Sequence, residues 1–346
     1  METRLIEVGR CPTEEELRPA AACIAAGGLV AFPTETVYGL GGNAYDADAA
    51  ARIYAAKGRP SDNPLIVHVA DPADTDRIAE TSALFWRLAA RFWPGPFTMI
   101  LPKKDVIPAS VTGGLDTVAV RCPSDAVASM LIRLSGVPIA APSANLSGHP
   151  SPTAAKHVIR DLYGRVDMIV CGEDADFGVE STVVRLDGDA LTLLRPGAVS
   201  YEMLCREVGQ ENVSVDPVVL GKVSADIKPQ SPGMKYRHYA PTAPVILLRG
   251  DDGAVLAEMK RLRANDPKAG FLVYEEDLSS LGGEYTMSLG KRDDVKEQAH
   301  RLFDCLRRFD ETDVSVIYAP VPTREGIGLA VYNRLGKAAG FEIITL

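Results

Sequence analysis

A chain of 346 residues with 46% hydrophobic and 24% charged residues has the composition of a soluble globular protein and is long enough for two domains. The formal net charge of −9 argues against a protein whose main function is to hold nucleic acid, because such binding depends on clustered Lys and Arg. No run approaches the roughly 18 apolar residues of a membrane span, and the N-terminal stretch has no signal-peptide core, so we expect the protein in the cytoplasm.

The cysteine pattern excludes a zinc ribbon or a redox motif. No CxxC pair and no His at metal-ligand spacing accompanies the six cysteines, which lie at positions 11, 23, 122, 171, 205 and 305. We therefore expect reduced, mostly buried thiols.

The first 200 residues alternate between helical and strand patterns. A capping box of Thr13 and Glu16 predicts a helix that ends at the Gly27-Gly28 pair, and the following strand breaks at Pro33 into a loop rich in hydroxyl groups. Apolar patterns then predict helices near residues 46–56, 82–93, 124–135 and 153–162, and strands near 64–70, 97–102, 117–123, 137–142, 167–172, 181–188 and 190–197. This alternation predicts an α/β domain over residues 1–205 with a largely buried, mixed sheet.

The next segment, residues 206–243, is rich in proline and has little periodicity, so we expect a linker. It ends in "SPGMKYRHYAP", whose aromatic and basic groups favour a lid ordered by substrates over a passive tether, although both remain open. Residues 244–346 then alternate strand and helix as in a smaller, doubly wound α/β domain. The Gly326-x-Gly328 pair lacks the third glycine of a dinucleotide fingerprint and indicates a tight turn into a helix.

Lys57 and Arg59 flank Gly58 at the predicted end of a helix, in what we expect to be an exposed loop. Two such cations beside a glycine suit a phosphate or carboxylate, but cations are also common at solvated helix ends. Polar residues follow several other predicted strands, and ligands of open α/β sheets bind where such loops converge. Taken singly, each of these polar residues is equally compatible with a turn or cap.

Together the motifs resemble a known family. In this order, "FPTETVYGL", "KGRPSDNPL", "WPGPFT", "RCP", "APSANLSG", "STVV" and "LRPG" are similar to the YrdC-type family of L-threonylcarbamoyladenylate synthases. "SPGMKYRHYAP" and the α/β tail resemble the long members of that family, with an additional C-terminal domain. The resemblance covers nearly the whole chain, and it implies a YrdC-like mixed, twisted sheet with a central cleft, followed by a Rossmann-like α/β domain.

The resemblance implies that L-threonine, bicarbonate or CO₂, and ATP give threonylcarbamoyl-AMP and pyrophosphate, with Mg²⁺ carried by ATP. A partner complex would then transfer the threonylcarbamoyl group to a tRNA adenosine beside the anticodon, and any tRNA contact of this chain would be weak and local. By similarity, Lys57 and Arg59 would be catalytic. The residues implied for ATP are Arg59, Asn63, Thr117, Ser143, Asn145, Ser151, Arg195 and Tyr236.

The residues implied for L-threonine are Thr36, His68, Arg121 and Ser181. Arg121 suits the carboxylate, and the other three suit the amine and hydroxyl; a lone His in a strand is more often structural, so the role of His68 rests on the resemblance. No general base is assigned. Two alternatives remain, namely a carbamoyl transferase or nucleotide hydrolase on the same fold and an RNA-binding module, although the low isoelectric point disfavours the latter.

Overall fold

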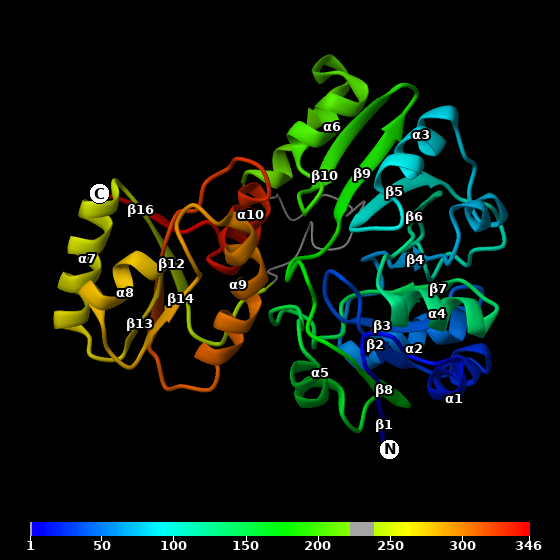
Figure 1. The fold of residues 1–346 in the computed structure, drawn as a ribbon, viewed down its shortest axis with the longest axis horizontal. Helices are drawn as coiled ribbons and strands as arrows, with labels where there is room; N and C mark the ends of the chain where they lie inside the picture. The colour runs from blue at the N-terminus through cyan, green and yellow to red at the C-terminus, as the bar shows by residue number, and fades with distance from the viewer. Residues whose placement is uncertain (1, 222–238) are drawn as a thin grey trace. The chain divides into compact units, whose positions relative to one another are not determined.

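The computed structural model describes residues 2–221 and 239–346 (Figure 1). These residues form two compact units. The first comprises residues 2–147 and 151–219, and the second comprises residues 148–150, 220–221 and 239–346. Each unit is described by itself below.

The first unit is built on one mixed sheet of eleven strands. In spatial order the strands are β1 (Arg4–Glu7), β8 (Met168–Cys171), β2 (Val30–Phe32), β3 (Gly39–Asn43), β7 (Ile139–Ala141), β4 (Ile66–His68), β6 (Thr117–Arg121), β5 (Phe97–Pro102), β9 (Thr182–Asp187), β10 (Ala190–Arg195) and β11 (Val213–Val215). The sheet contains both parallel and antiparallel pairs, for example β4 parallel to β6 and β5 antiparallel to β6. The prediction of a mixed α/β sheet is confirmed.

Helices pack on this sheet through their apolar faces. They are α1 (Glu14–Ala25), α2 (Ala47–Lys57), α3 (Ala83–Phe92), α4 (Ala126–Ser135), α5 (Ala155–Leu162) and α6 (Tyr201–Val208). Leu17 and Ile24 of α1 and Leu131 of α4 join Phe32 of β2 in one buried cluster, so α1 and α4 cover the same part of the sheet (Figure 1). The predicted capping box of Thr13 at the start of α1 is present.

The strand register places three polar side chains in one row. Arg121 pairs with His68 across the parallel β4–β6 ladder and with Thr98 across the antiparallel β5–β6 ladder. Residues that pair directly across strands point to the same face of a sheet. The carboxyl ends of β4 and β6 therefore present His68 and Arg121 side by side.

The second unit contains a five-stranded, entirely parallel sheet in the order β14 (Thr286–Ser288), β13 (Ala269–Val273), β15 (Val316–Pro320), β12 (Val245–Arg249) and β16 (Ile343–Thr345). The helices that connect these strands are α7 (Asp252–Asn265), α8 (Glu275–Leu281), α9 (Val295–Phe309) and α10 (Gly328–Ala338). Buried Phe271, Val255 and Met259 are part of the core between the sheet and α7. The predicted smaller, Rossmann-like α/β domain is confirmed.

The structure corrects the sequence-based prediction of a linker over residues 206–243 at its N-terminal end. Residues 201–219 instead form α6, the 3₁₀ turns η2 (Gln210–Asn212) and η3 (Pro217–Val219), and strand β11, which pairs with β10. A three-residue strand is too short to show periodicity, and its stability comes from the neighbouring strand. Residues 222–238 of the predicted linker, which include Tyr236, lie outside the described residues, whereas Tyr239 is described and is buried against Phe303.

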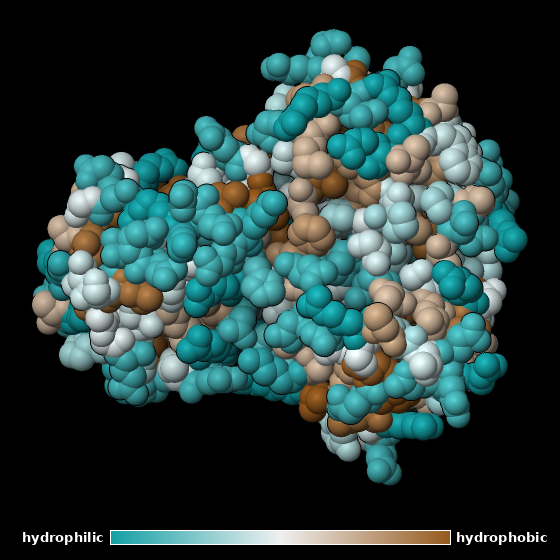
Figure 2. Space-filling view, viewed as in Figure 1, coloured by the Kyte–Doolittle hydropathy of each residue, from teal (hydrophilic) through white to brown (hydrophobic). Residues whose placement is uncertain are grey.

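On the face shown in Figure 2, hydrophilic residues predominate and apolar side chains gather only in small groups. Among the described residues, no helix is long and apolar enough to cross a membrane. All six cysteines are free thiols, and three of them, Cys122, Cys171 and Cys305, are buried.

Candidate functional site

Lys57 closes helix α2, and its ammonium group is buried against the loop that follows β7. The residue is 2% exposed, and Nζ donates to the backbone oxygen of Ser143 at 2.5 Å and to that of Asn145. Ser143 Oγ in turn donates to Asn145 Oδ1 at 2.5 Å. The expectation that Lys57 lies in an exposed loop is wrong, because the helix continues through it and ends at Gly58, whose φ of 62° forms a left-handed cap.

Arg59 lies in the loop after this cap and is partly exposed. Its Nε donates to the backbone oxygen of Asn63 at 3.3 Å, and its Nη2 donates to that of Pro64 at 3.1 Å. The Asn63 side chain is fully buried, and neither of its amide atoms has a hydrogen-bond partner among the described residues. A buried, unsatisfied amide is costly, so this position points to a ligand or a bound water.

Thr117 lies at the opposite end of strand β6 from Arg121. At about 3.3 Å per residue, the two side chains are separated by about 13 Å along the strand. The distance between Thr117, which is implied for ATP, and Arg121, which is implied for threonine, is therefore comparable to the length of a small molecule.

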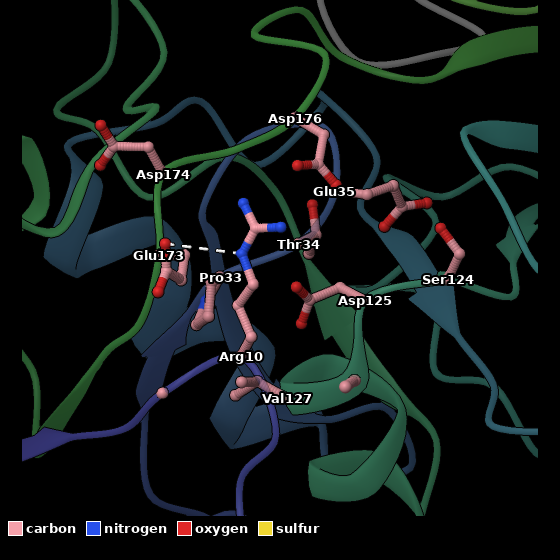
Figure 3. Close-up of a pocket in the computed structure, with 12 residues that line it drawn as sticks. Arg10, Pro33, Thr34, Glu35, Ser124, Asp125, Val127, Glu173, Asp174 and Asp176 are labelled. Carbon is pink, nitrogen blue, oxygen red and sulfur yellow. Dashed lines mark ion pairs between the residues drawn. The ribbon is translucent and has the colours of Figure 1, made fainter.

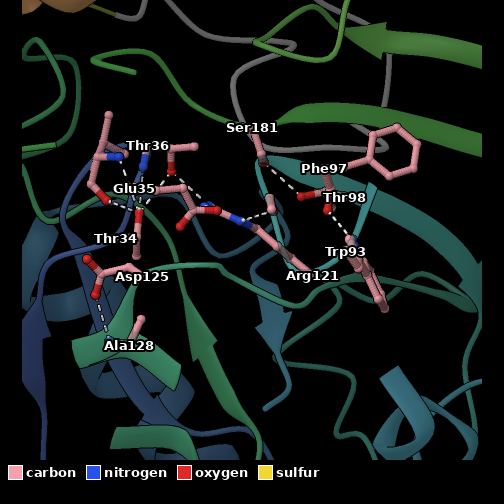
Figure 4. A network of polar contacts seen from close by, with 12 residues as sticks. Thr34, Glu35, Thr36, Trp93, Phe97, Thr98, Arg121, Asp125, Ala128 and Ser181 are labelled. Atoms are coloured by element: carbon pink, nitrogen blue, oxygen red, sulfur yellow. Dashed lines mark hydrogen bonds and ion pairs between the residues drawn. The ribbon is translucent and has the colours of Figure 1, made fainter. Parts of the chain in front are cut away.

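Arg121 is held by three neighbours although it is 4% exposed (Figure 4). Its Nη1 donates to Thr36 Oγ1 at 2.8 Å, its Nη2 lies 2.8 Å from Glu35 Oε1, and its Nε donates to the backbone oxygen of Gly95 at 3.4 Å. Buried charges persist in proteins only when they are paired and hydrogen-bonded. Glu35 supplies the counter-charge that allows a guanidinium group to be kept inside this site.

In the loop after β2, the contacts of the Thr34 and Thr36 hydroxyl groups determine which of the two donates a hydrogen bond to the other. Thr34 Oγ1 donates to the backbone oxygen of Val37 at 2.6 Å, which uses its only proton. Thr36 Oγ1 must therefore be the donor in the 2.9 Å contact with Thr34 Oγ1, and it accepts from Arg121. Thr36 thus has one lone pair left and can serve a ligand only as an acceptor.

His68 is neutral in this environment. Burial, and then the charge of Arg121, lower the pKa of His68 from its usual 6.5 to about 3. Nδ1 lies 3.1 Å from the backbone oxygen of Ile66 and 3.3 Å from that of Ile139. Both neighbours are acceptors, so Nδ1 carries the proton and Nε2 is an acceptor.

Ser181 joins the residues implied for threonine to one implied for ATP. Arg195 Nη2 donates to Ser181 Oγ at 3.0 Å, and Arg195 Nε donates to the backbone oxygen of Ser181 at 3.0 Å. The same Oγ is 2.8 Å from Thr98 Oγ1, in the strand row of Arg121 (Figure 4). Glu180, the residue before Ser181, binds Ser151: Ser151 Oγ donates to Glu180 Oε1 at 2.5 Å.

An acidic cavity of about 170 Å³ adjoins this network (Figure 3). Glu35, Asp125 and Asp176 are among the side chains that line it. Burial raises the pKa of Asp125 to about 6, the hydrogen bond from the backbone N–H of Ala128 opposes this, and the charge of Glu35 adds to it. Glu35 is thus the carboxylate shared by this cavity and the Arg121 site.

The structure brings the implied residues together in three groups. Thr36, His68 and Arg121 lie together at the ends of β4 and β6. Arg195 is bonded to Ser181 at the start of β9, where Ser151 is bonded to the neighbouring Glu180, and Lys57 is bonded to the backbone of Ser143 and Asn145 in the loop after β7. Arg59, Asn63 and Thr117 lie at or near the amino ends of β4 and β6. Their binding roles stay predictions.

Sequence reasoning missed three residues of these networks. Glu35 stands in a loop already noted for its polar groups, and its pairing with Arg121, 86 positions away, has no local signal. Thr98 is a polar residue in the otherwise apolar strand "FTMILP", which is the one signal that could have identified it. Glu180 precedes Ser181 and becomes visible only through its bond to Ser151.

Comparison with known proteins gives consistent matches over both units. Residues 22–197 match the Sua5/YciO/YrdC family model, described as telomere recombination, and residues 199–340 match the model of the C-terminal domain of threonylcarbamoyl-AMP synthase. A threonylcarbamoyl-AMP synthase of Pyrococcus abyssi is 48% identical over 343 residues, which is 99% of each chain. One of Bacillus subtilis is 46% identical, over 96% of this chain and 95% of the relative.

The fold agrees with these sequence matches. The crystal structure of P. abyssi Sua5 complexed with L-threonine superposes with a TM-score of 0.93 at 46% identity, and the match covers 99% of this chain and 100% of that one. The chain therefore belongs to the threonylcarbamoyl-AMP synthase family, with both the Sua5/YrdC-type domain and the C-terminal domain of its long members.

Proposed function

We propose that this protein is a cytoplasmic threonylcarbamoyl-AMP synthase that condenses L-threonine, bicarbonate or CO₂, and ATP to threonylcarbamoyl-AMP and pyrophosphate. The observation that carries the proposal is the connection from Arg121 through the strand row to Thr98, Ser181 and Arg195. It places a cation suited to a carboxylate next to a cation suited to a phosphate. A structure of a relative with L-threonine bound supports threonine as the ligand of this site.

The donors and acceptors of the site match the threonine zwitterion. Arg121 would bind the carboxylate, since its guanidinium group is oriented by Glu35 and Thr36. Thr36 Oγ1 and His68 Nε2 can only accept, which suits the ammonium and the side-chain hydroxyl of threonine. A site of this kind rejects analogues without the hydroxyl, because its own acceptor is then left unpaired.

The chemistry has two bond-forming steps. The threonine nitrogen, once deprotonated, attacks CO₂ with loss of a proton, or bicarbonate with loss of water, to form a carbamate. A carbamate oxygen then attacks the α-phosphorus of ATP while the bond to pyrophosphate breaks. The second step concentrates negative charge on the phosphate oxygens. Lys57, Arg59 and Arg195 are the cations proposed to stabilise it, and Asn63, Thr117, Ser143, Asn145 and Ser151 would hold the nucleotide.

Magnesium belongs to the proposal as the partner of ATP, because Mg²⁺ commonly binds substrate phosphates and keeps several waters. In residues 2–221 and 239–346, no group of three or more His, Cys, Asp or Glu side chains could hold a metal ion. Titration of the reaction with Mg²⁺ at fixed ATP tests this part. The product would pass to a complex that transfers the threonylcarbamoyl group to a tRNA adenosine, with at most a weak, local tRNA contact here.

The decisive experiment is pyrophosphate release by the purified protein. We expect release only when threonine, bicarbonate and ATP are all present. Release from ATP without threonine would indicate a nucleotide hydrolase, and ATP binding without any release would indicate a binding module. Mass spectrometry of the adenylate product distinguishes the synthase from a transferase that uses another carbamoyl donor.

A further inference from the structure

The parallel sheet of the second unit has a point at which its connections diverge. Strand β12 continues through α7 to β13 on one side, whereas its neighbour β15 continues through α10 to β16 on the other side. In open α/β sheets, ligands bind outside the carboxyl ends of the strands at such a switch point. Among the described residues implied for ATP or threonine, none lines this point of the sheet.

A crevice of about 240 Å³ occurs at this point. Its walls include Arg249 and Asp252 after β12, Tyr274 after β13, and Val321 and Thr323 after β15. Leu248, Val255 and Pro320 supply apolar surface to the same crevice. Polar and apolar groups thus share its lining, and a combination of apolar surface with a few convergent polar groups is typical of a small-molecule site.

The polar groups of the crevice differ in whether their hydrogen bonds and charges are already satisfied within the protein. Arg292 is held by Asp252 at 2.5 Å and by Asp277 at 2.7 Å and lies over the Tyr274 ring, so its charge is neutralised. Arg249 is exposed, and its guanidinium group forms no hydrogen bond or ion pair with any described residue. Thr323 Oγ1 accepts from the backbone N–H of Glu325 at 3.3 Å, which leaves its proton for a ligand.

The surrounding charges limit the ligand. The N-terminus of α7 is already capped by the Asp251 carboxylate, which accepts from the backbone N–H of Ala254 at 2.9 Å, so an anion would go to Arg249 instead. Asp252 and the acidic first turn of α8 flank the crevice and would repel a highly charged anion. One uncompensated cation beside several carboxylates suits a ligand with a single phosphate.

We propose that this crevice binds a nucleoside monophosphate. The flat base would lie against Val255 and Val321, the phosphate would bind Arg249 and Thr323, and the sugar hydroxyls would face Asp252 and Tyr274. A carboxylate can accept hydrogen bonds from the hydroxyl groups of a sugar, as in other nucleotide-binding sheets. The residues that line this crevice differ from those proposed for ATP, and the inference does not depend on the proposed activity.

The test is a titration of the full-length protein, labelled at the methyl groups of Val and Leu, with AMP followed by NMR. We expect shifts at the Val255 and Val321 methyls and weaker shifts there with ATP at equal concentration. Arg249→Ala should weaken the response at these methyls at least about tenfold, since a hydrogen bond to a charged group is worth about 1.5–3 kcal/mol. Arg261→Ala, an exposed change on α7 in the same unit, is the matched control and should leave it unchanged.

The variant Lys57→Ala separates the two nucleotide sites. In this variant the shifts at Val255 and Val321 should persist, whatever happens to catalysis. Shifts confined to methyls of the first unit, or a response at Val255 and Val321 that Arg249→Ala leaves intact, would overturn the proposal. A response stronger with ATP than with AMP would overturn the assignment to a monophosphate.

Discussion

Glu35 Oε1 lies 2.8 Å from Arg121 Nη2, and the two side chains are 3% and 5% exposed. The pair joins the loop after β2 to the end of β6 and makes a buried cation compatible with the core. Glu35 Oε2 has no hydrogen-bond partner among the described residues, so this carboxylate is only partly satisfied. We infer that this carboxylate serves to orient the Arg121 guanidinium group more than to stabilise the fold as a whole.

Glu35→Gln keeps the shape of the side chain and removes its charge. We expect the free energy of unfolding to fall by about 3 kcal/mol, because a buried cation is left without its counter-charge. We also expect the KM for threonine to rise at least about tenfold while the KM for ATP changes little. Urea unfolding and steady-state kinetics measure both effects, and Asp174→Asn, an acidic residue of the adjoining cavity, is the control. An unchanged KM for threonine would exclude a positioning role.

Arg59→Ala should reduce pyrophosphate release by about 10²–10³-fold with the fold intact, since the partly exposed guanidinium group is proposed to act on the phosphates. Lys57→Ala should lose activity and also stability, because Nζ holds the backbone oxygens of Ser143 and Asn145 inside the protein. Circular dichroism and thermal melts separate the two cases. Arg18→Ala on the exposed face of α1 serves as a control, and near-normal turnover of folded Arg59→Ala would contradict the assignment.

Serine should be a poorer substrate than threonine if the site packs the threonine methyl group. One methyl is worth about 1–3 kcal/mol of discrimination, which predicts a ratio of kcat/KM between roughly tenfold and a few hundredfold. Competition between the two amino acids at subsaturating concentration, followed by product mass spectrometry, gives this ratio directly. Equal use of both would show that no methyl pocket exists.

Stability should depend on pH through His68. Its pKa is lowered to about 3 in the folded protein, so between about pH 3 and pH 6.5 the unfolded chain binds one proton more than the folded one. The free energy of unfolding should therefore fall by about 1.4 kcal/mol for each pH unit below 6.5. His68→Gln should lack this contribution, whereas His300→Gln, at an exposed position, should retain it. Parallel slopes for wild type and His68→Gln would refute the buried, neutral state.

The sequence predicted the elements whose patterns are long. Helices α1, α3 and α4 and strands β5, β6 and β10 lie close to their predicted positions. Strand β3, "GLGGN", was missed because glycine has low strand propensity, and its pairing with β2 and β7 compensates. Helix α8 and strand β14 were missed because seven and three residues are too few for a reliable period.

The candidate site was predictable to a similar extent. Motif resemblance named Arg121 and Ser181 as candidates, because these lie in short conspicuous stretches of sequence, and their binding roles stay predictions. It could not identify Glu35 as the partner of Arg121 or Thr98 as the partner of Ser181, since each contact depends on strand register between distant segments. The burial of Lys57 likewise depends on the loop after β7, which sequence periodicity cannot place.

The Ser181 hydroxyl, shared by Arg195 and Thr98, has a consequence for how the binding of one substrate would affect the affinity for the other. Its Oγ is bound to Arg195 on one side and to Thr98 on the other, so a ligand that turns this hydroxyl changes the environment of both. Thermodynamic linkage then requires that threonine alters the affinity for ATP by the same factor as ATP alters the affinity for threonine. If threonine and ATP bind where we propose, they should therefore bind cooperatively, with the Ser181 hydroxyl as the coupling element.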